Sequence, residues 1–201
     1  GVRFLCERLP DIRRRLDVQF CIANVENASE GSGLVPEVVE RLGAAGVDVF
    51  TAGDHLYSKR QIFKVLGKDP RILRPANLSP RAKGPVFGVF ETAGALRVAV
   101  VSILGRMFMK PMDCPFRCMD ALVEKIRPET ALIVVDFHAE ATAEKVAMGR
   151  YLDGRVSAVV GTHTHIATAD AAVLPGGCAY VTDIGMTGPH DSVIGRRTDR
   201  V

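Results

Sequence analysis

Short apolar runs alternate with amphipathic segments along most of the chain, which is the pattern of an α/β protein. The predicted strands cover residues 18–25, 47–52, 86–90, 96–104, 131–137, 156–160 and 179–182. The predicted helices cover residues 34–45, 58–66, 119–126 and 141–151. Within the first of these helices, Leu34, Val38 and Leu42 recur at helical spacing.

Two of the predicted strands are joined by a short loop. Residues 91–95 connect the 86–90 run to the 96–104 run and are too few for a helical crossover, which favours a β-hairpin. One antiparallel pair among strands that are otherwise separated by helices gives a mixed sheet.

The composition fits one globular domain. The chain has 201 residues, 47% of them hydrophobic and 24% charged, which excludes collagen-like, disordered and coiled-coil classes. We see no internal repeat, low-complexity tract or linker that divides the sequence. A single domain over residues 1–201 is therefore expected.

The charge pattern narrows the expected partners. Lysine and arginine number 26 against 23 aspartate and glutamate, and the basic residues are scattered. The resulting positive electrostatic potential is too weak to indicate a stable nucleic-acid complex.

Apolar runs fall short of the roughly 18 residues that span a bilayer, and we see no secretory leader pattern, so a cytoplasmic protein without membrane contact is expected. The five cysteines are irregularly spaced and are expected to be free thiols.

Residues of metal-binding type follow directly after four of the predicted strands. They are Glu26 and Asn27, Asp54 and His55, His138, and the pair His163 and His165. Ligands of open α/β sheets bind beyond the carboxyl ends of the strands, so these segments are expected to meet at one edge. Side chains at i and i+2 of a strand point the same way, which favours a shared metal centre for His163 and His165.

Each of these residues also has an ordinary structural interpretation. Asn27 suits a turn, Asp54 suits the cap of a following helix, and His138 suits a hydrogen-bonded position in a buried loop. The coincidence of four such segments favours a metal site instead. Carboxylate, amide and imidazole ligands suit Fe, Mn or Zn, and their number suits two ions about 3.5–4 Å apart that share a carboxylate.

Six short motifs stand in order along the chain. They are VENA at residues 25–28, GDH at 53–55, RPAN at 74–77, DFHAEAT at 136–142, GTHTH at 161–165 and TDIGMTGP at 182–189. In this order they resemble the YmdB-like branch of the calcineurin-like metallophosphoesterases, a bacterial family. The resemblance implies a four-layer α/β/β/α fold with mixed sheets and a dinuclear metal centre. It also implies phosphodiesterase activity on 2′,3′-cyclic nucleotides or related phosphoesters.

The resemblance also implies a role for each candidate residue. Glu26 would bridge two divalent or mixed-valence metal ions, with Fe or Mn as the leading choices and Zn or Mg as alternatives. Asn27 and His165 would complete the first metal site, and the second would be held by Asp54, His138 and His163. His55 would protonate the leaving ribose oxygen while a metal-bound hydroxide attacks phosphorus.

Three features depart from the family pattern. The family opens with a strand carrying Gly-Asp-Val-Val-Gly, whose Asp binds the first metal, whereas this sequence begins at Gly1. The family has Asn where Asp54 stands here, and the added charge is expected to lower the Lewis acidity of the metal pair. Family members also continue beyond Val201, so we expect a fragment truncated at both ends, without the first strand and the C-terminal strands.

Two other functions remain open at this point. One is a catalytically impaired relative that binds a metal or nucleotide for regulation, because a first-site ligand is missing. The other is an enzyme with a different substrate, a phosphomonoesterase or phosphoprotein phosphatase. A homo-oligomer is also left open, while the primary partner is expected to be a small phosphoester substrate.

Overall fold

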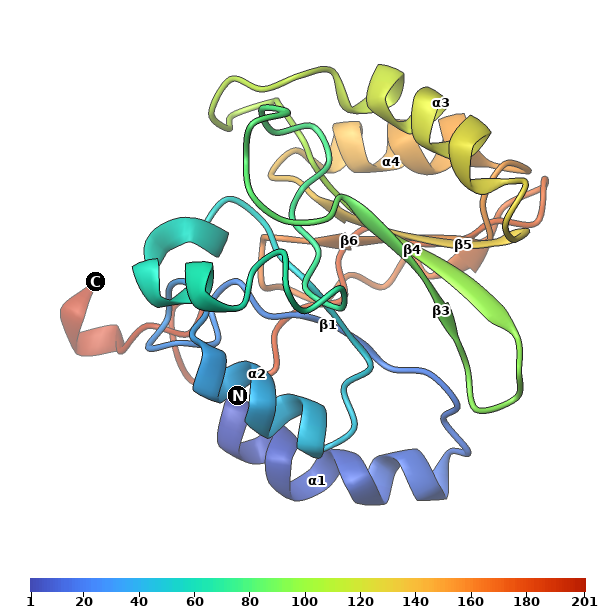
Figure 1. The fold of residues 1–201 in the computed structure, drawn as a ribbon. Coiled ribbons are helices and arrows are strands. Elements are labelled where there is room, and N and C mark those ends of the chain that lie inside the picture. The colour runs from blue at the N-terminus through green and yellow to red at the C-terminus, as the bar shows by residue number, and fades with distance from the viewer.

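Two layers of helices enclose two β-sheets in the computed structural model, which describes residues 1–201 apart from the side chain of residue 200. Helices α3 (Pro115–Ile126) and α4 (Thr142–Leu152) cover the outer face of the larger sheet (Figure 1). Helices α1 (Val2–Arg15) and α2 (Pro36–Ala44) lie on the opposite side, against the smaller sheet. The four-layer α/β/β/α arrangement implied by the resemblance is confirmed.

The larger sheet has six strands in the order β3-β4-β5-β6-β8-β7. Its strands are β3 (Phe87–Glu91), β4 (Arg97–Leu104), β5 (Leu132–His138), β6 (Ala158–Thr162), β7 (Ala172–Val173) and β8 (Ala179–Val181). Strands β4, β5, β6 and β8 are parallel, while β3 and β7 pair antiparallel at the two edges. The predicted hairpin and mixed sheet are thus confirmed. The smaller sheet pairs β1 (Ile22–Asn24) with β2 (Val49–Thr51) in parallel.

Three elements differ from the sequence prediction: helix α1 was not among the predicted helices, and one predicted helix and one strand also differ. Residues 58–66 do not form a single helix, because Lys59 has an extended backbone and separates two 3-10 helices, Leu56–Ser58 and Arg60–Lys64. Their buried side chains are Leu56 and Ile62, six positions apart, which is not a helical repeat. Strand β7 was not predicted, because its two residues are exposed and carry no apolar alternation against a core.

Strand β5 shows how the layers are held together. Its residues Ile133, Val135 and Phe137 are fully buried under α3 and α4, in the main apolar core. The alternate side chains point to the opposite face, as strand geometry requires. Val134 joins the thin apolar cluster between the two sheets, and Asp136 and His138 occupy the next two positions on that face.

A buried carboxylate fastens the two sheets to each other. Asp136 accepts hydrogen bonds from Asn24 Nδ2 at 2.9 Å, Thr51 Oγ1 at 2.5 Å and Thr162 Oγ1 at 2.6 Å. These three donors come from β1, β2 and β6, so one side chain joins the smaller sheet to the larger one. The register of both sheets near their carboxyl ends therefore depends on Asp136.

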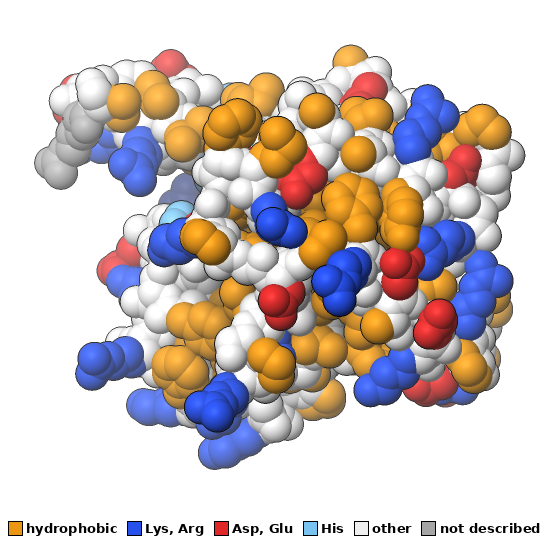
Figure 2. Space-filling model, turned by 90° about the horizontal axis from the view of Figure 1, so that it is seen from above, with side chains coloured by type: hydrophobic (Ala, Val, Ile, Leu, Met, Phe, Trp, Pro, Cys, Tyr) orange, Lys and Arg blue, Asp and Glu red, His pale blue; other side chains and the backbone are white. Residues whose placement is uncertain are grey.

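The outer face of the α3 and α4 layer carries apolar, basic and acidic side chains intermixed (Figure 2). Over the described residues, no helix is both long enough and apolar enough to cross a bilayer.

A buried ion pair supports the segment that follows β6. Lys145 Nζ of α4 donates to Asp183 Oδ2 at 2.7 Å, and both side chains are shielded from water. The same carboxylate accepts from the backbone N and the hydroxyl of Thr164. The pair thereby anchors the loop that carries His163 and His165.

We expect Lys145→Met to destabilise the fold strongly, because it leaves the charge of Asp183 buried without its cation. Breaking a buried pair in this way costs about 3–5 kcal/mol, which urea denaturation would measure. The matched control is Arg97→Ala, which breaks an exposed pair with Glu129 at 3.1 Å and is expected to cost less than about 1 kcal/mol. Equal losses in the two variants would contradict this prediction.

Candidate metal centre

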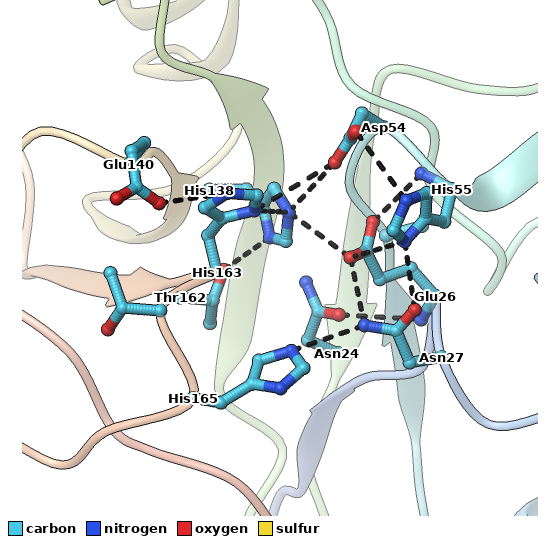
Figure 3. Close-up of polar contacts among 12 residues, drawn as sticks. Asn24, Glu26, Asn27, Asp54, His55, His138, Glu140, Thr162, His163 and His165 are labelled. Atoms are coloured by element: carbon cyan, nitrogen blue, oxygen red, sulfur yellow. Dashed lines mark hydrogen bonds and ion pairs between the residues drawn. The ribbon is translucent and has the colours of Figure 1, made fainter. Parts of the chain in front are cut away.

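Four side chains converge between the carboxyl ends of the strands (Figure 3). Glu26 and Asp54 stand in the loops after β1 and β2, His138 ends β5, and His163 follows β6. One ligand atom from each lies within 4.8 Å of the other three. The sequence predicted that these segments would meet, and the structure brings these four residues together.

The ring of His138 lies at the middle of the cluster. Its Nε2 is 3.3 Å from Glu26 Oε1, 3.4 Å from Asp54 Oδ1 and 3.0 Å from His163 Nδ1. Glu26 and His138 are buried, and the other two are partly exposed. Two carboxylates and two imidazoles therefore face one small volume.

This donor set fits a divalent metal ion. Asp54 Oδ1 is buried and has no hydrogen-bond partner among the described residues, so a lone pair remains free in the cluster. Gly53 permits the close approach, since a Cβ there would overlap the His138 ring and the Glu26 carboxylate. Mixed imidazole and carboxylate donors suit Fe, Mn or Zn.

The charges in the cluster shift the pKa of each member. Burial alone would lower the pKa of His138, but the Asp54 and Glu26 carboxylates outweigh it and raise the value to about 9. Contact with His138 is the main cause that holds the pKa of Asp54 far below its usual range. Burial opposes ionisation of Glu26, yet contacts including those with His138 and the His55 backbone leave its pKa lowered. Burial and the nearby His138 charge lower the pKa of His163.

Asn27, His55 and His165 form a second group beside the first. Asn27 Nδ2 lies 3.1 Å from Glu26 Oε1 and 3.3 Å from His165 Nε2, so it occupies the space between them. Asn27 Oδ1 accepts from His55 Nδ1 at 2.9 Å. His165 Nδ1 donates to Ile194 O at 2.9 Å, which turns Nε2 toward Asn27. His165 thus lies next to the four-residue cluster without belonging to it.

The two histidines of the GTHTH motif are not placed by strand alternation. Strand β6 ends at Thr162, and His163 and His165 have φ of +106° and +65°. Both values lie in the left-handed region, which costs a non-glycine residue about 1–3 kcal/mol and occurs preferentially at functional sites. The expected i, i+2 geometry therefore does not apply, and each ring goes to its own neighbours: His163 to His138 and His165 to Asn27.

Three further residues touch the site that sequence reasoning did not single out. Glu140 Oε2 lies 3.2 Å from His163 Nε2, and Thr162 Oγ1 lies 2.9 Å from His138 Nδ1. Asp136 in turn accepts from Thr162. The signal for Asp136 was available, because it precedes His138 by two positions in a predicted strand and so shares its face.

We expect His138→Ala and His163→Ala each to weaken Mn²⁺ binding about 100-fold or more, because each removes an imidazole from the cluster. Equilibrium dialysis of the purified variants would measure this, and circular dichroism would show that they remain folded. His190→Ala is the matched control, since His190 is exposed and is not one of the four cluster residues. Unchanged Mn²⁺ affinity in both cluster variants would contradict the assignment.

We expect Mn²⁺ binding to release about one proton at pH 7.5, because His138 with a pKa of about 9 is protonated in the metal-free chain. A histidine with its ordinary value would release only about 0.1 proton at this pH. Affinity should accordingly rise with pH and level off near pH 9. Calorimetry in two buffers of different ionisation enthalpy measures the proton count, and a count near zero would contradict the shift.

Comparison with known proteins places the chain in a family. The family model described as YmdB-like protein matches residues 1–201. The 2′,3′-cyclic-nucleotide 2′-phosphodiesterase of Bacillus subtilis (strain 168) is 43% identical over 189 residues, which cover 94% of this chain and 71% of that protein.

Two solved structures share the fold and much of the sequence. A hypothetical protein from Thermus thermophilus matches with a TM-score of 0.93 and 42% identity, over 99% of this chain and 77% of that one. A novel phosphatase from Mycoplasma pneumoniae matches with a TM-score of 0.91 and 33% identity, over 100% of this chain and 73% of that one. With motifs, fold and sequence in agreement, the chain belongs to the YmdB-like protein family.

Proposed function

We propose that this chain is a metal-dependent phosphodiesterase that opens 2′,3′-cyclic nucleotides to nucleoside monophosphates. The observation that carries the proposal is the cluster of two carboxylates and two imidazoles at the meeting point of four strand ends. The 43% identity to the Bacillus subtilis 2′,3′-cyclic-nucleotide 2′-phosphodiesterase supports the choice of substrate.

The donor groups divide between two ions, with Fe or Mn as the leading choices and Zn or Mg as alternatives. Asp54, His138 and His163 would hold one ion, Asn27 and His165 the other, and Glu26 would contribute to both. Because Asn27 turns its Nδ2 toward Glu26 and His165, its amide has to rotate before Oδ1 can act as a ligand. When bound, such ions neutralise phosphoryl oxygens and lower the pKa of bound water.

His55 is the residue we assign as proton donor. Asn27 Nδ2 faces an acceptor on Glu26, so its Oδ1 is left to accept from His55 Nδ1. In the metal-free chain that hydrogen bond orients the ring, and the side chain of His55 is 43% exposed. The backbone N of His55 donates to Glu26 Oε2 at 3.0 Å, which holds the loop against the cluster.

The reaction adds one water molecule across one bond of the cyclic phosphate. A new P–O bond forms from water, and the P–O bond to one ribose oxygen breaks. His55 in its protonated form gives the Nε2 proton to that ribose oxygen, and the proton lost from water restores His55 for the next turnover. Asp54 Oδ2 lies 3.8 Å from His55 Nε2, so the ring nitrogen that gives the proton lies beside the cluster.

The test of this proposal is hydrolysis of 2′,3′-cyclic AMP by the purified chain with Mn²⁺, followed by chromatography of the products. We expect AMP to form with the chain and with the His190→Ala control, and to fall below detection with His138→Ala. AMP that is further converted to adenosine and inorganic phosphate would instead indicate a phosphomonoesterase. A chain that binds Mn²⁺ but hydrolyses neither 2′,3′-cyclic AMP nor AMP would favour the interpretation as a regulatory metal-binding protein.

His55→Ala separates proton donation from metal binding. Loss of a general acid lowers kcat by roughly 10²–10⁴-fold, while Mn²⁺ content is expected to stay at the level of the unmodified chain. Loss of Mn²⁺ together with activity would show that His55 is a ligand, and the proton donor would then lie elsewhere.

A further inference from the structure

A chain of hydrogen bonds leads from the sheet-joining carboxylate to the metal cluster. Asp136 Oδ1 lies 2.6 Å from Thr162 Oγ1, and Thr162 Oγ1 lies 2.9 Å from His138 Nδ1. All three side chains are buried, with exposed fractions of 5% or less. His138 Nε2, the other ring nitrogen, faces Glu26 and Asp54.

The direction of each hydrogen bond in this chain is determined by the partners. Glu26 N donates to Asn24 Oδ1, so the Asn24 amide turns its Nδ2 toward Asp136, where it donates. Asp136 is therefore an acceptor, and Thr162 donates its single hydroxyl proton to Asp136. The Thr162 oxygen can then only accept from His138, which places a proton on Nδ1.

We propose that Thr162 and Asp136 are positioning residues that hold the proton on His138 Nδ1 and so reserve Nε2 as the metal-binding nitrogen. This inference rests on the proposed function in taking the cluster as a metal site. Histidines that bind metals usually donate their second N–H to a carboxylate, a carbonyl or water. Here a threonine hydroxyl relays that contact to a carboxylate that also joins the sheets.

Thr51 provides a matched control for the purely structural role. Its hydroxyl also donates to Asp136, at 2.5 Å, and its side chain is as buried as that of Thr162. No hydrogen bond joins Thr51 to His138 in the described structure. Removing either hydroxyl takes one donor from Asp136, but only removal at Thr162 also frees His138 Nδ1.

The experiment compares Mn²⁺ affinity among Thr162→Val, Thr162→Ser and Thr51→Val, without any phosphoester substrate. We expect Thr162→Val to weaken binding by about 10–100-fold, the usual loss when such an outer contact to a ligand is removed. Thr162→Ser keeps a hydroxyl and should restore the affinity of the unmodified chain. Thr51→Val should bind Mn²⁺ within about threefold of that affinity while its urea midpoint falls.

Equal Mn²⁺ affinity in Thr162→Val and Thr51→Val would overturn the proposal, as would a failure of Thr162→Ser to restore binding. An unmodified chain that binds no Mn²⁺ would overturn it as well. Because no substrate is present, a lack of phosphodiesterase turnover would count against the proposed function and leave this inference intact.

A measurement on the unmodified chain covers the case in which Thr162→Val does not fold. Nitrogen-15 NMR of the Zn²⁺-loaded chain reports which ring nitrogen of His138 carries a proton. We expect a slowly exchanging proton on Nδ1 and a metal-bound Nε2. Zn²⁺ on Nδ1, or a proton on Nε2, would overturn the proposal.

Discussion

The carboxylate of Asp136 is the interaction on which the two halves of the molecule depend. It takes donors from β1, β2 and β6, so one buried group joins the two sheets, together with the hydrogen bond from Ser102 Oγ to Ala52 O and a thin apolar cluster. A buried charge is tolerated only when its acceptor positions are filled. The three donors together fill these positions, so the loss of any one of them weakens the contact between the sheets, and the metal cluster lies directly beside this contact.

Two energetically unfavourable features, like charges in close contact and left-handed backbone, occur together at the strand ends and are stabilised by neighbouring residues. Glu26 and Asp54 bring two carboxylates together, and the raised pKa of His138 shows how far that ring compensates them. The left-handed backbone at His163 and His165 is stabilised by the Lys145–Asp183 pair, because Asp183 accepts a hydrogen bond from the backbone N of Thr164 between them. Local strain and like charges persist there because the surrounding layers are fully packed.

The sequence predicted which strand ends carry the chemistry better than it predicted how the side chains are oriented. Apolar runs ending in Glu26, Asp54 and His138 were enough to place these residues at one edge, because parallel strands carry their carboxyl ends together. The orientation of His163 and His165 could not be predicted, since it depends on turns with positive φ. Thr162 was passed over because a threonine at the end of a strand has no chemical signature until its partners are known, whereas the position of Asp136 two residues before His138 could have indicated it. The helix predicted over 58–66 was wrong because tertiary packing of Ile62 overrode its helical capping signals.

The four cluster residues come from opposite sides of the seam between the sheets. Glu26 and Asp54 extend from the smaller sheet, and His138 and His163 from the larger one. An ion bound among them would cross-link the halves of the fold much as a disulfide does. At a free metal concentration of 100 Kd such an ion would add about 2.7 kcal/mol to the free energy of unfolding. The melting temperature of this chain therefore reports metal occupancy, and removal of the metal by a chelator lowers the free energy of unfolding of the whole fold.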